Sequence, residues 1–352
     1  MKLSSECVAK LVDFTSRLIM KIGIGIPKMN FASPIKSVKT NTFNLTKQDF
    51  VAGLITDELI LSSDCATSTL GSNTDGFLMM GRKFWVAVPR ALTIAGSDCS
   101  GGAGLQADLK VFFRFGVFGQ SAVTAVVAEN TVGVQGVAAV RPDFVALQID
   151  SCLSDVGADV VKTGMLVDSD IVQAVAERLR FHDVRRLVID PVMCAKNGDR
   201  LIAVEAVHTL VNSLFPLATV VTPNVPEAEA LWGRKIQSVM DFRTAAVAIR
   251  AMGPRVVVMK GGHSPVNPEG ESVDYVLSGD DWVPISGPRG SDRNTHGTGC
   301  TFSAAIAARM ARGDDPVTAV RVAKQYITDA IATAPDLGHG HGPVNHWAEL
   351  NR

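Results

Sequence analysis

From residue 91 onward, short apolar runs alternate with longer segments in which apolar residues recur at helical spacing. The runs are Ala91–Ala95, Val160–Lys162, Leu187–Ile189, Thr219–Val221 and Val256–Met259, each followed by a polar or Gly/Pro-rich turn. The segments with helical spacing are Asp143–Asp155, Asp168–Arg180, Ala203–Leu214, Asp241–Met252 and Pro316–Ala334. This alternation predicts an α/β fold with a mostly parallel central sheet and helices on both faces.

Residues 1–90 differ from the rest of the chain in charge and periodicity. They hold 11 Lys and Arg against 7 Asp and Glu, whereas residues 91–352 hold 23 against 28. We therefore predict a poorly ordered N-terminal extension over residues 1–90 and a folded domain over residues 91–348. The segment Val8 to Lys21 has the charge pattern of a basic amphipathic helix, as in organelle transit peptides. Met79-Met80 would instead suit a chain start, so a targeting segment, a mis-assigned start and a regulatory appendage all stay open.

The composition of the whole chain excludes several classes of partner. Its net charge of −1 provides no basic surface for nucleic acid, and no apolar run approaches the roughly 20 residues of a membrane span. The six cysteines are scattered singly, which argues against a disulfide scaffold and a zinc site. We predict a soluble, cytoplasmic protein with a small-molecule substrate, or an organellar one if residues 1–47 are a transit peptide.

The turn Ala95–Gly104 follows the first predicted strand and contains four glycines. Ligands of open α/β sheets bind at the carboxyl ends of the strands, and glycines let the backbone approach a ligand closely. The spacing is neither that of a dinucleotide fingerprint nor that of a Walker-type loop. The turn therefore indicates either a ligand site of another kind or a plain strand-to-helix connection.

The segment Asn294–Thr301 precedes an Ala-rich helical stretch, Phe302 to Arg312. Glycines at a helix start leave amide N–H groups and a positive dipole end that favour a phosphate. We predict an anion hole here, with a plain N-capped helix as the alternative. Cys300 would gain thiolate character from the same dipole, although a small buried Cys is the commoner fate of this residue type.

Three further turns after apolar runs carry polar side chains. Asn224 and Glu227 follow one run, and carboxylate and amide oxygens suit Mg²⁺. Lys260 ends another run, where it can neutralise nucleotide phosphates. Asp190 ends a third. Each is weak evidence alone, but all of them fall at one end of the predicted sheet.

Seven motifs occur in order between residues 91 and 348. They are ALTIAGSDCSGGAGLQADLKVF (91–112), VKTGML (161–166), VIDPVM (188–193), TPNVPEAEAL (222–231), MKGGH (259–263), NTHGTGCTFSAA (294–305) and GHGPVNHW (340–347). Together they resemble the hydroxymethylpyrimidine/phosphomethylpyrimidine kinases of thiamine biosynthesis, members of the ribokinase-like superfamily. The resemblance implies a three-layer α/β sandwich, ATP and Mg²⁺ as cofactors, and a homodimer. It also implies phosphorylation of 4-amino-5-hydroxymethyl-2-methylpyrimidine and then of its monophosphate.

The resemblance also implies a role for each matching residue. The pyrimidine pocket would be lined by Gly96, Asp108, Glu129 and Met165. ATP and its metal would be held by Asp190, Thr222, Asn224, Lys260 and Gly262, with Glu227 on the metal. The catalytic group would be Lys260 with the anion hole formed by Gly297, Thr298, Gly299 and Cys300. Cys300 stands where sugar kinases of the superfamily use an Asp base.

One position departs from the family pattern, which usually has Gln where this chain has Glu129. Gln offers the pyrimidine both an acceptor and a donor, whereas an ionised Glu offers acceptors only. Either Glu129 or the bound ring would then carry a proton, and the pH dependence of binding would change. Two other functions stay open at this point: a pyridoxal kinase, and a non-catalytic protein that binds a vitamer.

Overall fold

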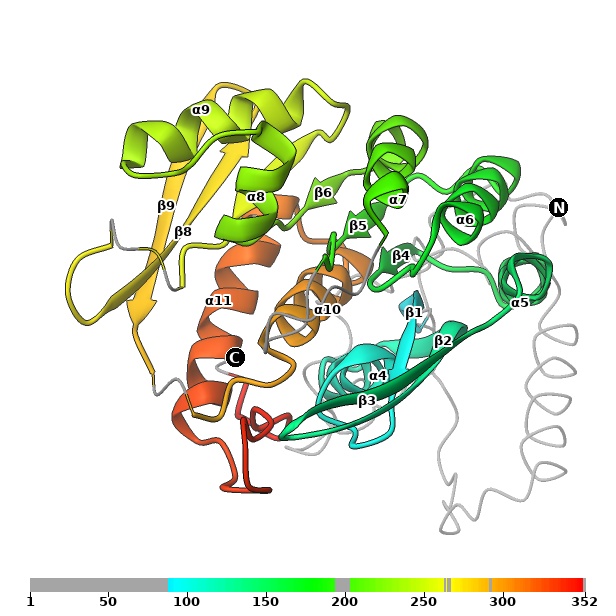
Figure 1. The fold of residues 1–352 in the computed structure, drawn as a ribbon, viewed down its shortest axis with the longest axis horizontal. Coiled ribbons are helices and arrows are strands. Elements are labelled where there is room, and N and C mark those ends of the chain that lie inside the picture. The colour runs from blue at the N-terminus through cyan, green and yellow to red at the C-terminus, as the bar shows by residue number, and fades with distance from the viewer. Residues whose placement is uncertain (1–87, 194–202, 263, 265–266, 291–292, 351–352) are drawn as a thin grey trace, which may run out of the picture. The chain divides into compact units, whose positions relative to one another are not determined.

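The structure is a computed structural model that describes residues 88–193, 203–262, 264, 267–290 and 293–350 (Figure 1). All of them belong to the unit Ala87–Arg352. Almost all of the predicted N-terminal extension, including residues 8–21 and 79–80, lies outside the described residues. Among the helices that are described, none has the length and apolarity to cross a bilayer.

The described strands form a single sheet in the order β3-β2-β1-β4-β5-β6-β7-β8-β9. Their bounds are β1 Arg90–Asp98, β2 Phe118–Asn130, β3 Gly133–Ala139, β4 Val160–Thr163, β5 Leu187–Ile189, β6 Val220–Val221, β7 Val256–Met259, β8 Glu271–Ser278 and β9 Asp281–Pro288. From β2 to β7 all neighbours are parallel, and β3, β8 and β9 add antiparallel edges. The mostly parallel sheet is confirmed, and the five predicted runs are β1 and β4 to β7.

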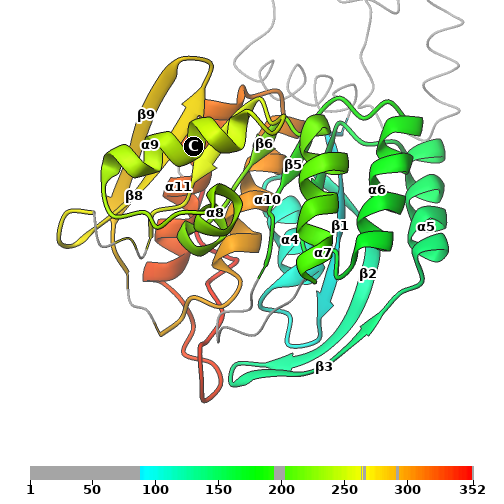
Figure 2. The same cartoon turned by 45° about the horizontal axis from the view of Figure 1, so that its top comes forward.

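Helices cover both faces of this sheet (Figures 1 and 2). Their bounds are α4 Gly104–Arg114, α5 Pro142–Asp155, α6 Ser169–Phe181, α7 Val204–Thr209, α8 Val225–Trp232, α9 Val239–Arg250, α10 Thr298–Ala311 and α11 Pro316–Ala332. A hydrophobic core lies on each face of the sheet, and alternate residues of a strand point into one or the other. Leu187 and Ile189 pack with α5, α6, α8 and α9, whereas Val188 packs with α4, α10 and α11. The predicted three-layer sandwich is therefore confirmed.

The structure departs from the predicted elements in two ways. The helix expected over Ala203–Leu214 is α7 followed by a π-helical turn, Leu210–Leu214, and a 3₁₀ turn, Phe215–Leu217. Pro216 has no N–H to extend a regular helix at that point. The four strands β2, β3, β8 and β9 and helix α8 were not predicted. For β3 and β9 the reason is exposure, because partly exposed strands lack the continuous apolar run that marks a buried one.

Candidate active site

A cavity of about 940 Å³ opens at the carboxyl ends of the parallel strands. It brings together twelve of the fourteen residues that the sequence pointed to. These are Gly96, Glu129, Met165, Asp190, Asn224, Glu227, Lys260, Gly262, Gly297, Thr298, Gly299 and Cys300. They come from strand ends, the loops after them and the first turns of α8 and α10, so the fold gathers positions up to two hundred residues apart.

Asp108 and Thr222, which the sequence also pointed to, are not among the residues that line this cavity. Asp108 lies on α4 with no exposed surface, where it accepts hydrogen bonds from Lys162 Nζ (2.8 Å) and Thr93 Oγ1 (2.5 Å). Thr222 is also fully buried, and its hydroxyl donates to Asp190 Oδ1 (3.2 Å). Each side chain is therefore bound to a buried partner, and its predicted contact with a ligand stays a prediction.

Helix α10 begins at the cavity with Gly297 as its N-cap. Gly297 has φ 78°, and a side chain there would overlap the carbonyl oxygen of Gly102 in the β1–α4 loop. The absence of a side chain therefore lets two ligand loops touch, and leaves the first amides of α10 without a capping side chain. Thr298, Gly299 and Cys300 line the cavity at this positive helix end, which is the arrangement that binds phosphate.

A buried ion pair stands beside the helix start. Lys260 Nζ donates to Asp190 Oδ1 over 2.8 Å, and a Cβ built on Gly299 would lie 3.5 Å from that nitrogen. Burial alone would raise the pKa of Asp190, but Lys260, Lys162 and hydrogen bonds hold it below its ordinary value. The carboxylate of Asp190 is therefore ionised, and it orients the ammonium group of Lys260 next to the anion-binding amides.

Glu227 is the second carboxylate at this end of the cavity. It forms a capping box at the start of α8, accepting from the Asn224 amide (2.8 Å) while its own amide donates to Asn224 Oδ1 (2.9 Å). Burial raises the pKa of Glu227, Lys260 opposes this, and the nearby Asp190 charge adds to the rise. Asp190 and Glu227 place two carboxyl groups near Lys260, and carboxylate oxygens are ligands that a divalent cation such as Mg²⁺ prefers.

A second buried ion pair holds the loop that carries Lys260. Lys324 on α11 donates to Asp274 Oδ2 on β8 (2.9 Å), and the Gly261 amide donates to Asp274 Oδ1 (2.9 Å). Lys324 and Asp274 both line the cavity. Sequence reasoning missed them, because they lie fifty residues apart on elements that carry no motif.

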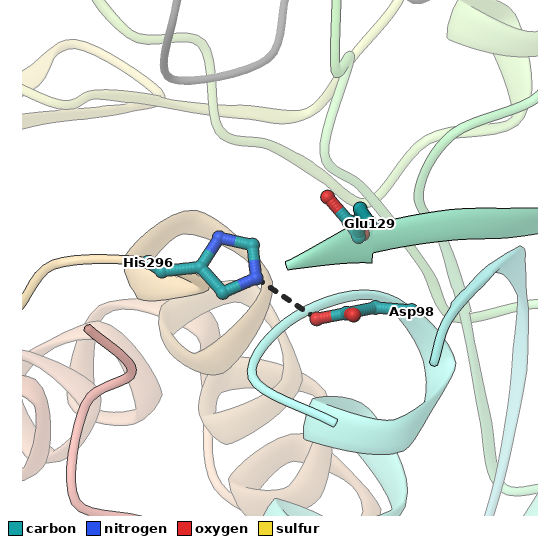
Figure 3. A group of neighbouring side chains, drawn as sticks. All are labelled: Asp98, Glu129 and His296. Atoms are coloured by element: carbon teal, nitrogen blue, oxygen red, sulfur yellow. Dashed lines mark hydrogen bonds and ion pairs between the residues drawn. The ribbon is translucent and has the colours of Figure 1, made fainter. Parts of the chain in front are cut away.

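Three titratable side chains meet where two strand ends approach the loop before α10 (Figure 3): Asp98 from the end of β1, Glu129 from the end of β2 and His296 from that loop. Glu129 and His296 line the cavity, and Asp98 is fully buried beside them. His296 Nε2 lies 2.9 Å from Asp98 Oδ2. Asp98 and His296 belong to motifs that the sequence showed but were not selected as site residues. A carboxylate at a strand end before a glycine-rich turn was the available signal.

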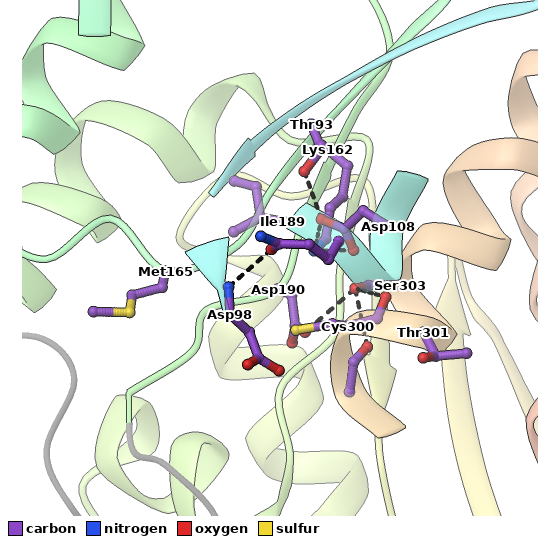
Figure 4. A network of polar contacts seen from close by, with 12 residues as sticks. Thr93, Asp98, Asp108, Lys162, Met165, Ile189, Asp190, Cys300, Thr301 and Ser303 are labelled. Carbon is purple, nitrogen blue, oxygen red and sulfur yellow. Dashed lines mark hydrogen bonds and ion pairs between the residues drawn. The ribbon is translucent and has the colours of Figure 1, made fainter. Parts of the chain in front are cut away.

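Cys300 lies next to Asp190, close to the buried pair of Lys162 and Asp108 (Figure 4). Burial raises the pKa of its thiol to about 11, more than Lys162 lowers it. A raised pKa argues against the thiolate character expected from the helix dipole and favours the protonated thiol at neutral pH. Cys300 lines the cavity as part of the anion hole, and its role as a base stays a prediction.

The fold and this cavity are those of a small-molecule kinase of the α/β class. The chain matches the phosphomethylpyrimidine kinase family over residues 98–345 and belongs to it. It is 43% identical over 263 residues to the hydroxymethylpyrimidine/phosphomethylpyrimidine kinase of Bacillus subtilis, covering 75% of this chain and 96% of that protein. It is 49% identical over 255 residues to the thiamine biosynthesis bifunctional protein ThiED of Geobacter sulfurreducens, with 72% of this chain and 51% of that longer protein covered.

Two solved structures show the same architecture. The pyridoxal kinase of Staphylococcus aureus, in complex with AMP-PCP and pyridoxal, matches with a TM-score of 0.69 at 35% identity, covering 76% of this chain and 96% of that one. The phosphomethylpyrimidine kinase of Clostridium difficile matches with a TM-score of 0.62 at 39% identity, covering 70% of this chain and all of that one. The fold is thus shared by kinases for two heteroaromatic rings.

Proposed function

We propose that this chain transfers the γ-phosphoryl group of ATP to 4-amino-5-hydroxymethyl-2-methylpyrimidine and then to the resulting monophosphate. The observation that carries the proposal is the single cavity, in which the start of α10 and Lys260 face the pocket formed by Gly96, Met165 and Glu129. Relatives at 43% to 49% identity are named for this pyrimidine kinase activity or for thiamine biosynthesis, which supports the same substrate.

The chain's own residues perform this transfer by position and charge. A loose phosphoryl transition state spreads negative charge over three oxygens and leaves little covalent chemistry to the protein. The amides of Gly299 and Cys300 and the ammonium of Lys260 line the same cavity and would stabilise that charge, and Asp190 keeps the ammonium in place. The cavity walls hold the alcohol in line with the phosphate, which makes the reaction effectively unimolecular.

Mg²⁺ fits the carboxyl oxygens of Asp190 and Glu227, and we include it in the proposal. When bound, it would neutralise the ATP phosphates and polarise the one that is transferred. Both Glu227 oxygens already accept backbone hydrogen bonds, from Asn224 (2.8 Å) and from Met193 (3.3 Å). The orientation of Glu227 is therefore fixed by the protein itself.

Phosphorylation of pyridoxal is the second candidate function. The likeness to the pyridoxal kinase of Staphylococcus aureus favours it, because that structure overlaps most of this chain. The two substrates differ at the ring edge: the pyrimidine carries an amino group next to a ring nitrogen. The edge that meets Glu129 therefore decides between them.

The test is ADP release from ATP by the full chain, followed in a coupled assay with the hydroxymethylpyrimidine, its monophosphate and pyridoxal. We expect both pyrimidines to have a kcat/KM at least tenfold above that of pyridoxal. Turnover of pyridoxal alone would replace the proposal by its second candidate. Tight binding of a vitamer with no ADP release would make the chain a non-catalytic binding protein.

Domain extent, assembly and location are also proposals. The matched region and the described fold support a catalytic domain over residues 91–348. A homodimer is common among soluble enzymes, and sedimentation of the full chain would measure it. We propose a cytoplasmic location, with an organelle as the alternative that a fusion of residues 1–47 to a fluorescent reporter would reveal.

A further inference from the structure

Glu129 is held in the cavity by an irregularity in the sheet. The register between β2 and β3 shifts between Ala128 and Glu129, and such a bulge re-aims the side chain at the strand end. Cys99 clamps the backbone there: its Sγ lies 3.2 Å from the Glu129 carbonyl oxygen and 3.4 Å from the Glu129 nitrogen. The backbone of Glu129 is therefore held in one position, from which its side chain lines the cavity.

Asp98 is the fixed negative charge beside it. The carboxylate of Asp98 is fully buried and accepts the amide hydrogens of Ser100 (2.7 Å), Gly102 (2.9 Å) and Ala103 (2.7 Å) as well as His296 Nε2 (2.9 Å). Burial would raise the pKa of Asp98, but these hydrogen bonds hold it well below its ordinary range. Asp98 consequently stays ionised at and above neutral pH.

Glu129 responds to this neighbour. Side-chain oxygen and nitrogen atoms of Asp98, Glu129 and His296 all lie within 4.8 Å of one another (Figure 3). Burial raises the pKa of Glu129 to about 7, the Asp98 charge adds to the rise, and His296 opposes it. The other titratable groups on this side are Cys99 on the β1–α4 loop and His341, which lines the same cavity from the C-terminal segment.

The protonation state of Glu129 decides which ring edge it can bind. A neutral carboxylic acid presents one O–H donor and one carbonyl acceptor side by side, whereas a carboxylate presents acceptors only. An aminopyrimidine presents the complementary pair, a ring-nitrogen acceptor next to an amino donor. A carboxylate would meet the ring nitrogen with its own lone pair and leave that nitrogen unpaired in a partly buried site.

We propose that Glu129 binds the aminopyrimidine edge as a neutral carboxylic acid, held in that form by its burial in the cavity wall next to the fixed charge of Asp98, so that substrate binding above neutral pH takes up one proton. This inference rests on the proposed function. It makes Glu129 a specificity-determining residue, because only a ring with an acceptor next to a donor can pair with both groups of the acid. It also makes the affinity for the substrate dependent on pH.

The test is calorimetric titration of the full chain and its Glu129→Gln variant with the hydroxymethylpyrimidine, from pH 6 to pH 9. The amide of Gln presents a donor and an acceptor without a proton. Protonation of the free ring affects both proteins equally, so it cancels in the ratio of their Kd values. We expect a ratio within a few-fold of one at pH 6, and wild-type affinity that weakens relative to the variant by about tenfold per pH unit above pH 7.

Two further readouts identify the group that carries the proton. Titrations in buffers of different ionisation enthalpy should show uptake of nearly one proton at pH 9 by the wild type and none by Glu129→Gln. The ultraviolet spectrum of the bound pyrimidine should be that of the neutral ring. The control His341→Gln removes the neighbouring histidine and should keep the wild-type pH slope.

The proposal is overturned if the ratio of Kd values stays constant from pH 6 to pH 9, or if His341→Gln abolishes the slope. It is also overturned if Glu129→Gln binds at least tenfold more weakly than the wild type at pH 6 while the bound ring shows the spectrum of its cation, because the ring and not Glu129 would then carry the proton. Failure of the proposed function looks different, since the coupled assay would show no ADP release with the pyrimidine at any pH.

Discussion

The two ends of the cavity use charge in different ways. At the phosphate end, Lys260 and Asp190 form a buried pair, and Lys324 pairs with Asp274 close by. At the ring end, Asp98 is satisfied by amides and His296, whereas Glu129 is half-buried and has its pKa near neutrality. Charges in ion pairs keep the same ionisation state, which suits a phosphate substrate that is always anionic. Among the described residues the Glu129 carboxyl has no ion-pair partner, so it can change its protonation state to match the hydrogen-bonding groups of the ring.

Replacing Lys260 by Met tests the phosphate end most severely. The variant removes the cation beside the α10 amides and leaves Asp190 buried without its ion-pair partner. We expect kcat to fall by about 100- to 1,000-fold, the range for removal of one group that stabilises transition-state charge. The matched control is Lys235→Met, which removes an exposed lysine that pairs with Glu229. This variant should keep wild-type turnover in the coupled assay. A Lys260→Met enzyme with kcat within threefold of wild type would contradict this role.

Replacing Gly297 by Ala tests the contact between the two ends. The new Cβ would overlap the Gly102 carbonyl oxygen, and φ 78° would strain any residue other than glycine. We expect kcat/KM to fall on the order of 30- to 100-fold and the Tm to drop, since strain of this kind costs about 1–3 kcal/mol.

The control for this variant is Gly136→Ala on strand β3, where a Cβ meets nothing within 4 Å. Differential scanning calorimetry should find its Tm close to that of the wild type. Equal behaviour of the two alanine variants in calorimetry and in the coupled assay would show that the loops do not need their close approach.

Replacing Lys324 by Met tests whether the second ion pair supports the first. Asp274 would be left buried without its cation, which destabilises by about 3–5 kcal/mol, and the loop that begins at Gly261 would lose its anchor. We expect the KM for ATP to rise on the order of tenfold, with the KM for the pyrimidine changed less. The double variant Lys324→Met/Asp274→Asn keeps an acceptor for the Gly261 amide and should recover part of the ATP affinity. An unchanged KM for ATP in the single variant would show that the Lys324–Asp274 ion pair does not support ATP binding.

The smallest expected effect concerns cysteine reactivity. Because burial raises the pKa of Cys300 to about 11, little of it is thiolate at pH 7.5, whereas Cys99 is exposed. We expect iodoacetamide to alkylate Cys300 about tenfold more slowly than Cys99, as measured by mass spectrometry of peptides. The rate at Cys300 should rise about tenfold per pH unit up to pH 9, because its thiolate fraction does so below the pKa. Faster labelling of Cys300 than of Cys99 at pH 7.5 would instead support an activated thiolate at Cys300.

The phosphate end was the more predictable from the sequence. Its residues follow buried parallel strands or open a helix, and both features leave strong local patterns: an apolar run before Lys260, and glycines before the Ala-rich α10. The sequence did not indicate which motif side chains are bound to buried partners. Asp108 occurs in a ligand-loop motif, yet it pairs with Lys162 beneath the cavity, and no local pattern distinguishes these two fates.

The ring end was less predictable because long-range pairings build it. The β2–β3 bulge that aims Glu129 depends on a strand whose residues are mostly exposed and show no apolar run. The pairing of Asp98 with His296 joins positions 198 residues apart. Sequence reasoning could identify Glu129 only through its motif, and the charge that governs it became visible only in three dimensions.

The most direct measurement is mass spectrometry of the reaction products when the full chain is incubated with ATP and 4-amino-5-hydroxymethyl-2-methylpyrimidine. If both ends of the cavity serve one transfer reaction, the monophosphate appears first and the diphosphate accumulates as the monophosphate declines. ATP hydrolysis without a phosphorylated pyrimidine, or no loss of ATP at all, would contradict the assignment of the cavity to this reaction.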